Sequence, residues 1–224
     1  MRYKKSWSTF FEILFLLGGL IIVFLGLTLT FSRAAWLGVL LGIIVIGFHA
    51  FRQDDSWIRR RFLKIVFALG LASLVFGSIL QEQIFPRFDT ATIEREGSVS
   101  ERMVSLKDAQ PLIEENPFVG VGAGNFTAAI IEKGERGVMG EMGRPVWSIQ
   151  PAHNIFILIC AELGLTGLLL FIGFLFSVLK PAINNPQSVI LITILPSLFL
   201  DHFLWTSHFG LLFFFLLLGL TSRR

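Results

Sequence analysis

The chain alternates between long apolar runs and short polar connections, except for one long polar segment in the middle. A helix rises about 1.5 Å per residue, so about 20 apolar residues cross the hydrocarbon core of a bilayer. Three runs near this length precede the polar segment and three follow it, which predicts about six membrane-spanning helices. The runs are Phe10–Leu29, Ala34–Phe51, Phe62–Leu80, Ile155–Leu179, Val189–Leu204 and Trp205–Leu220.

The same pattern divides the chain into three parts that together form one domain. Residues 1–80 are expected to hold three transmembrane helices, residues 81–154 a polar loop, and residues 155–224 about three more transmembrane helices. The predicted fold class is all-α, a polytopic membrane helix bundle with one large extracytoplasmic loop that contains short helices. Pro196 lies inside the fifth run and predicts a kink there.

A helix is expected inside the loop. Ser98 and Glu101 have the spacing of a helix-capping pair, and apolar residues recur after them at helical intervals. Pro111 is expected to kink or end this helix, and Asn116-Pro117 to stop whatever remains.

Composition agrees with a membrane protein and argues against a soluble one. Hydrophobic residues make up 54% of the 224 residues and charged residues 16%, against about a quarter in ordinary soluble domains. The net charge of +3 does not indicate nucleic-acid binding, because the basic residues flank the apolar runs and form no continuous stripe. The one cysteine, Cys160, lies in an apolar run and forms no intramolecular disulfide.

The basic residues also predict the orientation. With six spans, those that flank the runs fall on one side, which the positive-inside rule makes cytoplasmic. We therefore expect a protein of the cytoplasmic (inner) membrane with both termini in the cytoplasm and the large loop outside. These residues are Arg2, Lys4, Lys5, Arg52, Arg59, Arg60, Arg61, Lys64, Lys180, Arg223 and Arg224.

Two arginines fall on the outer side of the predicted bundle. Arg33 lies in the tight turn between the first two spans, where a cation beside hydrocarbon usually has a partner or a function. Its alternative role is to snorkel and cap the outer end of a helix. Arg102 lies on the predicted loop helix, where the alternative is a solvated surface charge.

A histidine begins the fourth span. Asn154 is a good N-cap for that helix, so His153 lies at the positive end of the helix dipole. A neutral imidazole can act as a general base, although a lone histidine is more often structural. Asp201 and His202 lie at the outer end of the fifth span. Their adjacency makes metal-ligand spacing poor, so no metal site is predicted.

A glycine-rich run, Gly120 to Phe126, follows the loop helix. It does not match the spacing of a dinucleotide-binding loop, and no βαβ unit surrounds it. The glycines instead indicate a tight turn in which the backbone approaches another helix or a ligand closely.

In their order along the chain, these motifs resemble the O-antigen ligase and polymerase superfamily. The motifs are Ser32-Arg33 between two spans, Arg102 before Pro117 and the glycine run, and His153-Asn154 opening a span that continues as Ala161 to Gly167. The resemblance covers the chain from about Thr28 onward.

The resemblance implies a metal-independent, inverting glycosyltransferase without a cofactor. Such enzymes move a glycan from undecaprenyl diphosphate to an acceptor hydroxyl at the outer membrane face. The partners implied are the lipid-linked glycan donor, membrane lipid, and a glycan, lipid or protein acceptor. Carried over residue by residue, the catalytic set is His153, Arg33 and Arg102, and the substrate-binding set is Ser32, Gly122, Gly124, Asn125, Asn154 and Asp201.

Two alternatives accompany this interpretation. The chain could bind the carrier lipid or assist assembly in polysaccharide export without catalysis. A small transporter is disfavoured, because the ionisable groups gather at the outer rim and not near the midplane. Members of the superfamily usually have several more spans before the Ser-Arg turn, so an N-terminal half or a partner subunit is expected to supply the rest.

Overall fold

The computed structural model describes residues 7–30, 32–84, 98–135, 149–182 and 188–222, and every regular element among them is a helix. The all-α prediction is therefore confirmed for this part of the chain. The helices are α1 (Trp7–Leu29), α2 (Arg33–Arg52), α3 (Ser56–Ile79), α4 (Gln81–Ile84), α6 (Ser98–Glu115), α7 (Phe126–Glu135), α8 (Ile155–Ala182), α9 (Ser188–Leu200), α10 (Phe203–Thr206) and α11 (His208–Ser222).

Among the described residues, three helices are long and apolar enough to cross a membrane. They span Arg33–Arg52, Ser56–Ile79 and Ile155–Lys180, and they coincide with the second, third and fourth predicted runs. The described apolar segments Val189–Leu200 and His208–Thr221 are shorter than the 18 residues expected of a span. The first predicted run lies within the 23-residue helix α1.

The fifth and sixth runs differ from their predicted bounds. α9 ends at Leu200, and the short helix α10 intervenes before α11 begins at His208. The Asp201 carboxylate explains the break, because its Oδ1 accepts hydrogen bonds from the backbone N–H groups of His202 at 2.7 Å and Phe203 at 3.1 Å. These bonds form a turn before α10 where the apolar pattern alone suggested that the fifth run continues to Leu204.

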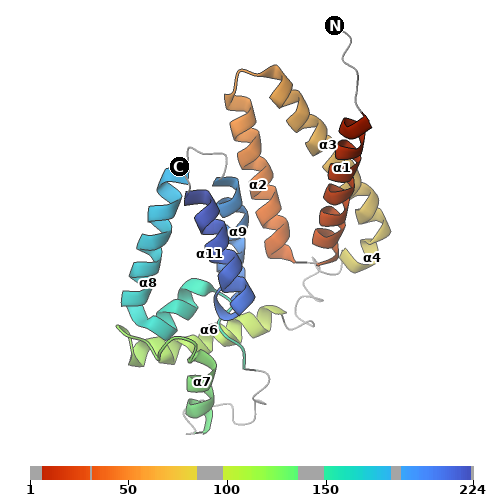
Figure 1. Ribbon diagram of the computed structural model, residues 1–224. Coiled ribbons are helices and arrows are strands. Elements are labelled where there is room, and N and C mark those ends of the chain that lie inside the picture. Colours follow the sequence, from red (N-terminus) through yellow and green to blue (C-terminus); the bar gives the residue numbers. More distant parts are fainter. Residues whose placement is uncertain (1–6, 31, 85–97, 136–148, 183–187, 223–224) are drawn as a thin grey trace.

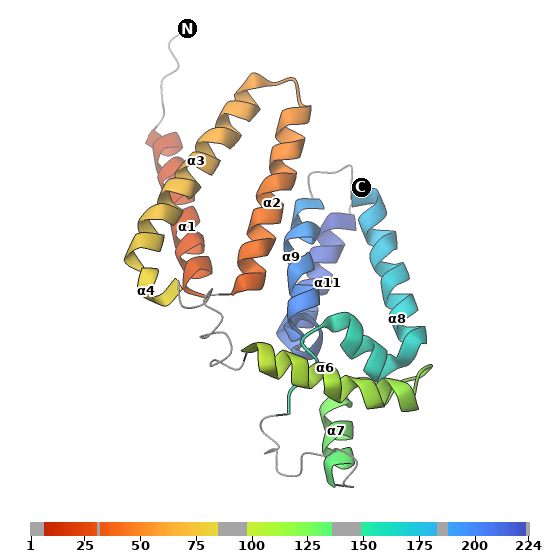
Figure 2. The same cartoon turned by 180° about the vertical axis from the view of Figure 1, so that it is seen from behind.

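The helices form two groups, with α1 to α4 on one side and α8, α9 and α11 on the other (Figures 1 and 2). The groups meet where α2 packs against α9. Gly38 and Gly42 permit this contact: a Cβ added to Gly38 would lie 2.1 Å from the carbonyl oxygen of Thr193, and one added to Gly42 would lie 2.4 Å from the Thr193 side chain. Small residues allow such close helix packing in membranes.

The second group contains the larger hydrophobic core. Side chains of α8, α9, α10 and α11 bury one another, and Phe214 and Leu198 are among the largest that are fully buried. By contrast, α3 buries none of its residues. Apolar side chains cover its exposed surface, as expected for a helix that faces lipid or another membrane helix.

α6 lies across one end of the second group, and α7 projects beyond it (Figures 1 and 2). α6 continues through Pro111, so the proline does not end the helix as the sequence allowed, and it stops at Glu115 before Asn116-Pro117 as predicted. Buried residues of α6, α7 and the start of α8 form a second core, which contains Leu112, Phe126 and Leu158.

Candidate functional site

The first residues of α2, the whole of α6, the start of α8 and the last residues of α9 lie at the same end of the bundle (Figures 1 and 2). α1 begins and α11 finishes at the opposite end. All of the residues predicted to form the site lie in these segments, directly beside them, or in the glycine run.

Arg33 is the first residue of α2, directly after the N-cap Ser32. The Ser32 hydroxyl accepts a hydrogen bond from the N–H of Ala35 at 3.3 Å, so this side chain starts the helix. The Arg33 side chain is half-buried. Burial of this extent agrees better with a partnered or functional cation than with a fully solvated one.

The packing of α2 on α9 determines where Arg33 lies along the length of α9. The two helices run in opposite directions, and Arg33 lies five residues from Gly38, the position that touches Thr193. At a rise of about 1.5 Å per residue, Arg33 is level with Leu198, which is five residues from Thr193. Arg33 is therefore close to the last turn of α9.

Arg102 lies on the face of α6 that packs against α8. Residues at positions 102, 105, 109 and 112 share one helical face, and Ser105, Ala109 and Leu112 are all buried. Arg102 is half-buried, one turn beyond them. No described carboxylate forms an ion pair with its guanidinium. The Arg102 side chain is therefore partly shielded from solvent.

His153 precedes α8, and Asn154 caps that helix as predicted. Asn154 Oδ1 accepts a hydrogen bond from the N–H of Ile157 at 3.1 Å. Asn154 Nδ2 donates to the carbonyl of Phe199 at 3.3 Å, which ties the start of α8 to the last turn of α9. This tie explains how His153 comes to lie beside residues almost 50 positions later in the chain.

The imidazole rings of His153 and His202 lie next to each other across this junction. Their centroids are 4.9 Å apart, and the planes are tilted by 52°. His153, Asp201 and His202 each offer one metal-ligating atom, and these atoms all lie within 4.8 Å of one another. The spacing argument against metal ligation considered Asp201 and His202 alone, and it missed the third group because the fold brings that group from α8.

Hydrogen bonds orient both imidazoles. His202 Nδ1 lies 2.8 Å from Thr206 Oγ1, and this hydroxyl donates to the His202 carbonyl at 3.2 Å. The hydroxyl therefore accepts from Nδ1, which leaves the lone pair on Nε2. His153 Nε2 lies 3.2 Å from Gln150 Oε1, and in the tautomer that donates to this acceptor the lone pair is on Nδ1.

His202 lies in the turn between α9 and α10, where burial lowers its pKa below the ordinary value of 6.5. The neighbouring His153 lowers this pKa further, and Asp201 opposes the change. Burial and a nearby imidazolium both disfavour the charged ring, whereas a carboxylate favours it. The net result favours the neutral form of the His202 imidazole.

We expect His153→Gln to raise the pKa of His202 and Asp201→Asn to lower it. The first change removes a like charge and the second removes an opposite one. Titration of the histidine ring protons by NMR in detergent micelles measures both. Thr127→Ala, on α7, is the control and should leave the pKa of His202 unchanged. A His202 that titrates above 6.5 in the native chain would contradict the assignment.

The glycine run docks on a break in α8. Gly164 has φ 68° and ψ −174°, a conformation open essentially to glycine alone, so the helical hydrogen bonds stop there. The run replaces them: the N–H groups of Val121 and Gly122 donate to the carbonyls of Ala161 at 3.0 Å and Glu162 at 2.8 Å. In return, the N–H of Leu165 donates to the carbonyl of Pro117 at 2.8 Å.

In this arrangement the residues of the glycine run that were predicted to bind substrate form hydrogen bonds and turns within the protein. Gly122 bonds to α8, and Gly124 has φ 73° in the turn. Asn125 Nδ2 donates to the Val121 carbonyl at 3.3 Å, and its own carbonyl accepts from Ala129 in α7. Of the two options that the sequence left open, close approach to another helix describes these contacts.

Glu162 and Trp205 form a pair that sequence reasoning missed. Glu162 is 3% exposed, and its Oε2 accepts a hydrogen bond from Trp205 Nε1 at 3.2 Å. Trp205 packs against both hydrophobic cores. The signal available in the sequence was a carboxylate inside an apolar run, which requires a buried partner.

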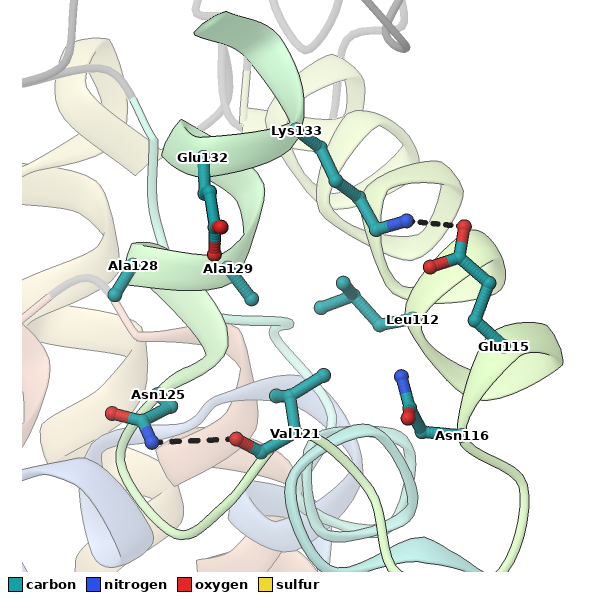
Figure 3. A pocket seen from close by; sticks show the side chains of 9 residues that line it. All are labelled: Leu112, Glu115, Asn116, Val121, Asn125, Ala128, Ala129, Glu132 and Lys133. Carbon is teal, nitrogen blue, oxygen red and sulfur yellow. Dashed lines mark hydrogen bonds and ion pairs between the residues drawn. The ribbon is translucent and has the colours of Figure 1, made fainter. Parts of the chain in front are cut away.

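A polar pocket of about 410 Å³ opens between the end of α6, the glycine run and α7 (Figure 3). Lys133 bonds to Glu115 at its rim, and Asn116, Asn125 and Glu132 also line it. Its volume is within the range of small-molecule sites. Carboxylate and amide groups suit a hydroxyl-rich ligand better than an apolar tail.

Comparison with known proteins gives one finding. The family model described as O-antigen ligase matches residues 18–172, which is more than half of the 224-residue chain. The matched segment includes Arg33, Arg102, the glycine run and His153, and it ends inside α8. No curated protein and no solved structure matches.

Proposed function

Since this chain belongs to the O-antigen ligase family, we propose that it moves a glycan from undecaprenyl diphosphate to an acceptor hydroxyl. The family and the apolar helices make it an integral membrane protein of surface-polysaccharide synthesis. We propose further that it lies in the cytoplasmic membrane with both termini inside, and that transfer takes place at the outer face.

The two arginines would bind the diphosphate. A guanidinium stays charged and pairs with two phosphate oxygens at once, so it suits the leaving group of this reaction. Negative charge grows on the diphosphate as the glycosidic bond breaks, and fixed cations stabilise that charge most in a site partly shielded from water. Half-burial of Arg33 and Arg102 meets this requirement.

His153 would act on the acceptor. Its lone pair on Nδ1 would take the proton of the acceptor hydroxyl, or orient that hydroxyl, while the oxygen attacks the anomeric carbon. Attack opposite the diphosphate inverts the anomeric centre. In this mechanism the arginines balance the charge of the leaving group, so catalysis does not require a metal ion.

One observation supports this proposal most: Arg102 is half-buried on the α8-facing side of α6, and no described carboxylate forms an ion pair with it. A cation is rarely held in such a position unless an anion completes it. The tie from Asn154 to Phe199 and the packing of α2 on α9 support the presence of His153 and Arg33 at the same end of the bundle.

We expect His153→Gln to lower kcat/KM for transfer by about 10²- to 10⁴-fold, because the acceptor proton would lose its base. The assay follows release of undecaprenyl diphosphate in membrane vesicles that contain the lipid-linked glycan and an acceptor. His208→Gln is the matched control, since His208 is exposed at the same end of the bundle. Excess chelator should leave the native rate unchanged.

The second candidate is a non-catalytic carrier binder. It would bind undecaprenyl diphosphate through the same arginines and release nothing. Binding without release by the native chain, together with any partner subunit that completes it, would favour this candidate over transfer.

A further inference from the structure

His153, Asp201 and His202 have the composition of a metal site. Two imidazole nitrogens and one carboxylate oxygen lie within 4.8 Å of one another. Two histidines and one carboxylate are a known ligand set for zinc, in which three protein groups leave the fourth tetrahedral position open. The set is assembled from two segments that the bond between Asn154 and Phe199 joins.

The groups around these side chains are also those that orient metal ligands. A ligating histidine usually donates its second ring N–H to a protein oxygen, which fixes the tautomer. His202 does so through Nδ1 to Thr206, and His153 does so through Nε2 to Gln150. Two backbone N–H groups hold the Asp201 carboxylate. Each residue therefore has the support that a ligand needs.

The donor atoms select the class of cation. Imidazole nitrogen suits zinc, cobalt, nickel and copper ions, whereas magnesium and calcium prefer sites made of oxygen alone. The three side chains are half-buried, so they are partly shielded and still open to solvent. A zinc-class ion is the ligand that this chemistry fits.

We propose that His153, Asp201 and His202 bind one zinc-class divalent cation, and that this cation inhibits glycan transfer by occupying the lone pair of His153. The second part rests on the proposed function, in which His153 acts on the acceptor. The cation is thus an inhibitor of a reaction that itself needs no metal.

Cobalt provides a direct test of binding that does not depend on activity. The full chain, purified in detergent and freed of metal with chelator, is titrated with CoCl₂ while the visible absorption of tetrahedral cobalt is followed. We expect one cobalt per chain, displaced by ZnCl₂. His202→Gln and Asp201→Asn should each weaken binding by at least about tenfold, while His208→Gln and His49→Gln should not.

Thermal unfolding of each variant in detergent separates a lost ligand from a lost fold. Asp201→Asn keeps an oxygen that can accept the backbone hydrogen bonds of His202 and Phe203, so it guards against a fold lost with the turn as the cause of weaker binding by this variant. Absence of cobalt absorption from the native chain, or equal affinity in His202→Gln and His208→Gln, would overturn the site.

The transfer assay tests inhibition. Micromolar ZnCl₂ should inhibit the native chain, and chelator should restore the rate. If cobalt binds but the native chain transfers no glycan, the metal site stands and the proposed function fails. If the native chain transfers glycan but binds no cobalt, or if bound zinc leaves the rate unchanged, the further inference fails and the proposed function stands.

Discussion

Arg102→Ala should lower kcat/KM for glycan transfer by about 10²- to 10³-fold, the effect of removing one fixed charge from a developing anion. The side chain lies on the face of α6 that contains the buried residues Ser105, Ala109 and Leu112. Its loss would leave the leaving-group charge stabilised by Arg33 alone. Release of undecaprenyl diphosphate from the lipid-linked glycan in vesicles measures the effect.

Two further variants sharpen this experiment. Arg102→Lys keeps the charge but loses the two-pronged contact with phosphate, so we expect it to recover only part of the rate. Lys107→Ala is the control, because Lys107 is exposed on the same helix, and it should transfer at the native rate. A native rate for Arg102→Ala in chains that insert normally would exclude the arginine from catalysis.

Gly164→Ala should destabilise the chain by more than about 4 kcal/mol, which is exceptional for a single substitution. The new Cβ would lie 2.2 Å from the carbonyl carbon of Phe118, and the backbone at φ 68° admits almost no other residue. Both effects act on the junction where the glycine run supplies hydrogen bonds to α8. Thermal unfolding in detergent, followed by tryptophan fluorescence, measures the loss.

Other glycines separate the two causes. Gly124 has φ 73° but nothing within 4 Å of an added Cβ, so Gly124→Ala should cost only about 1–2 kcal/mol for the backbone strain. Gly134 is in the helix α7 with open space around it, so Gly134→Ala should be neutral or stabilising by up to about 1 kcal/mol. Equal melting temperatures for the Gly164 and Gly134 variants would refute the clash.

Helices were predictable where apolar runs are long. The second, third and fourth runs became α2, α3 and α8 because their length and composition leave no other structure in a membrane. The break after Leu200 was not predictable from hydropathy, since it depends on the hydrogen bonds of one carboxylate, Asp201. Likewise, Pro111 was compatible with either a break or a continuous α6.

The sequence indicated which residues are candidates for the site, but it did not indicate which of them contact one another. Polar groups at the ends of apolar runs drew attention to Arg33, His153 and Asp201. The contacts between candidate residues depend on long-range packing. His202 lies beside His153 because the end of α9 packs against the start of α8. The pairing of Glu162 with Trp205 required the same information.

The contact of Gly38 with Thr193 has a consequence for saturation mutagenesis. It is a close approach between α2 and α9, and Gly38 lies five residues from Arg33. A side chain larger than that of glycine at position 38 must displace α2 from α9. Because the helix is rigid, its first residue, Arg33, is displaced as well. Substitutions buried between α2 and α9 will then mimic the loss of Arg33, the arginine proposed to bind phosphate, although they touch neither donor nor acceptor.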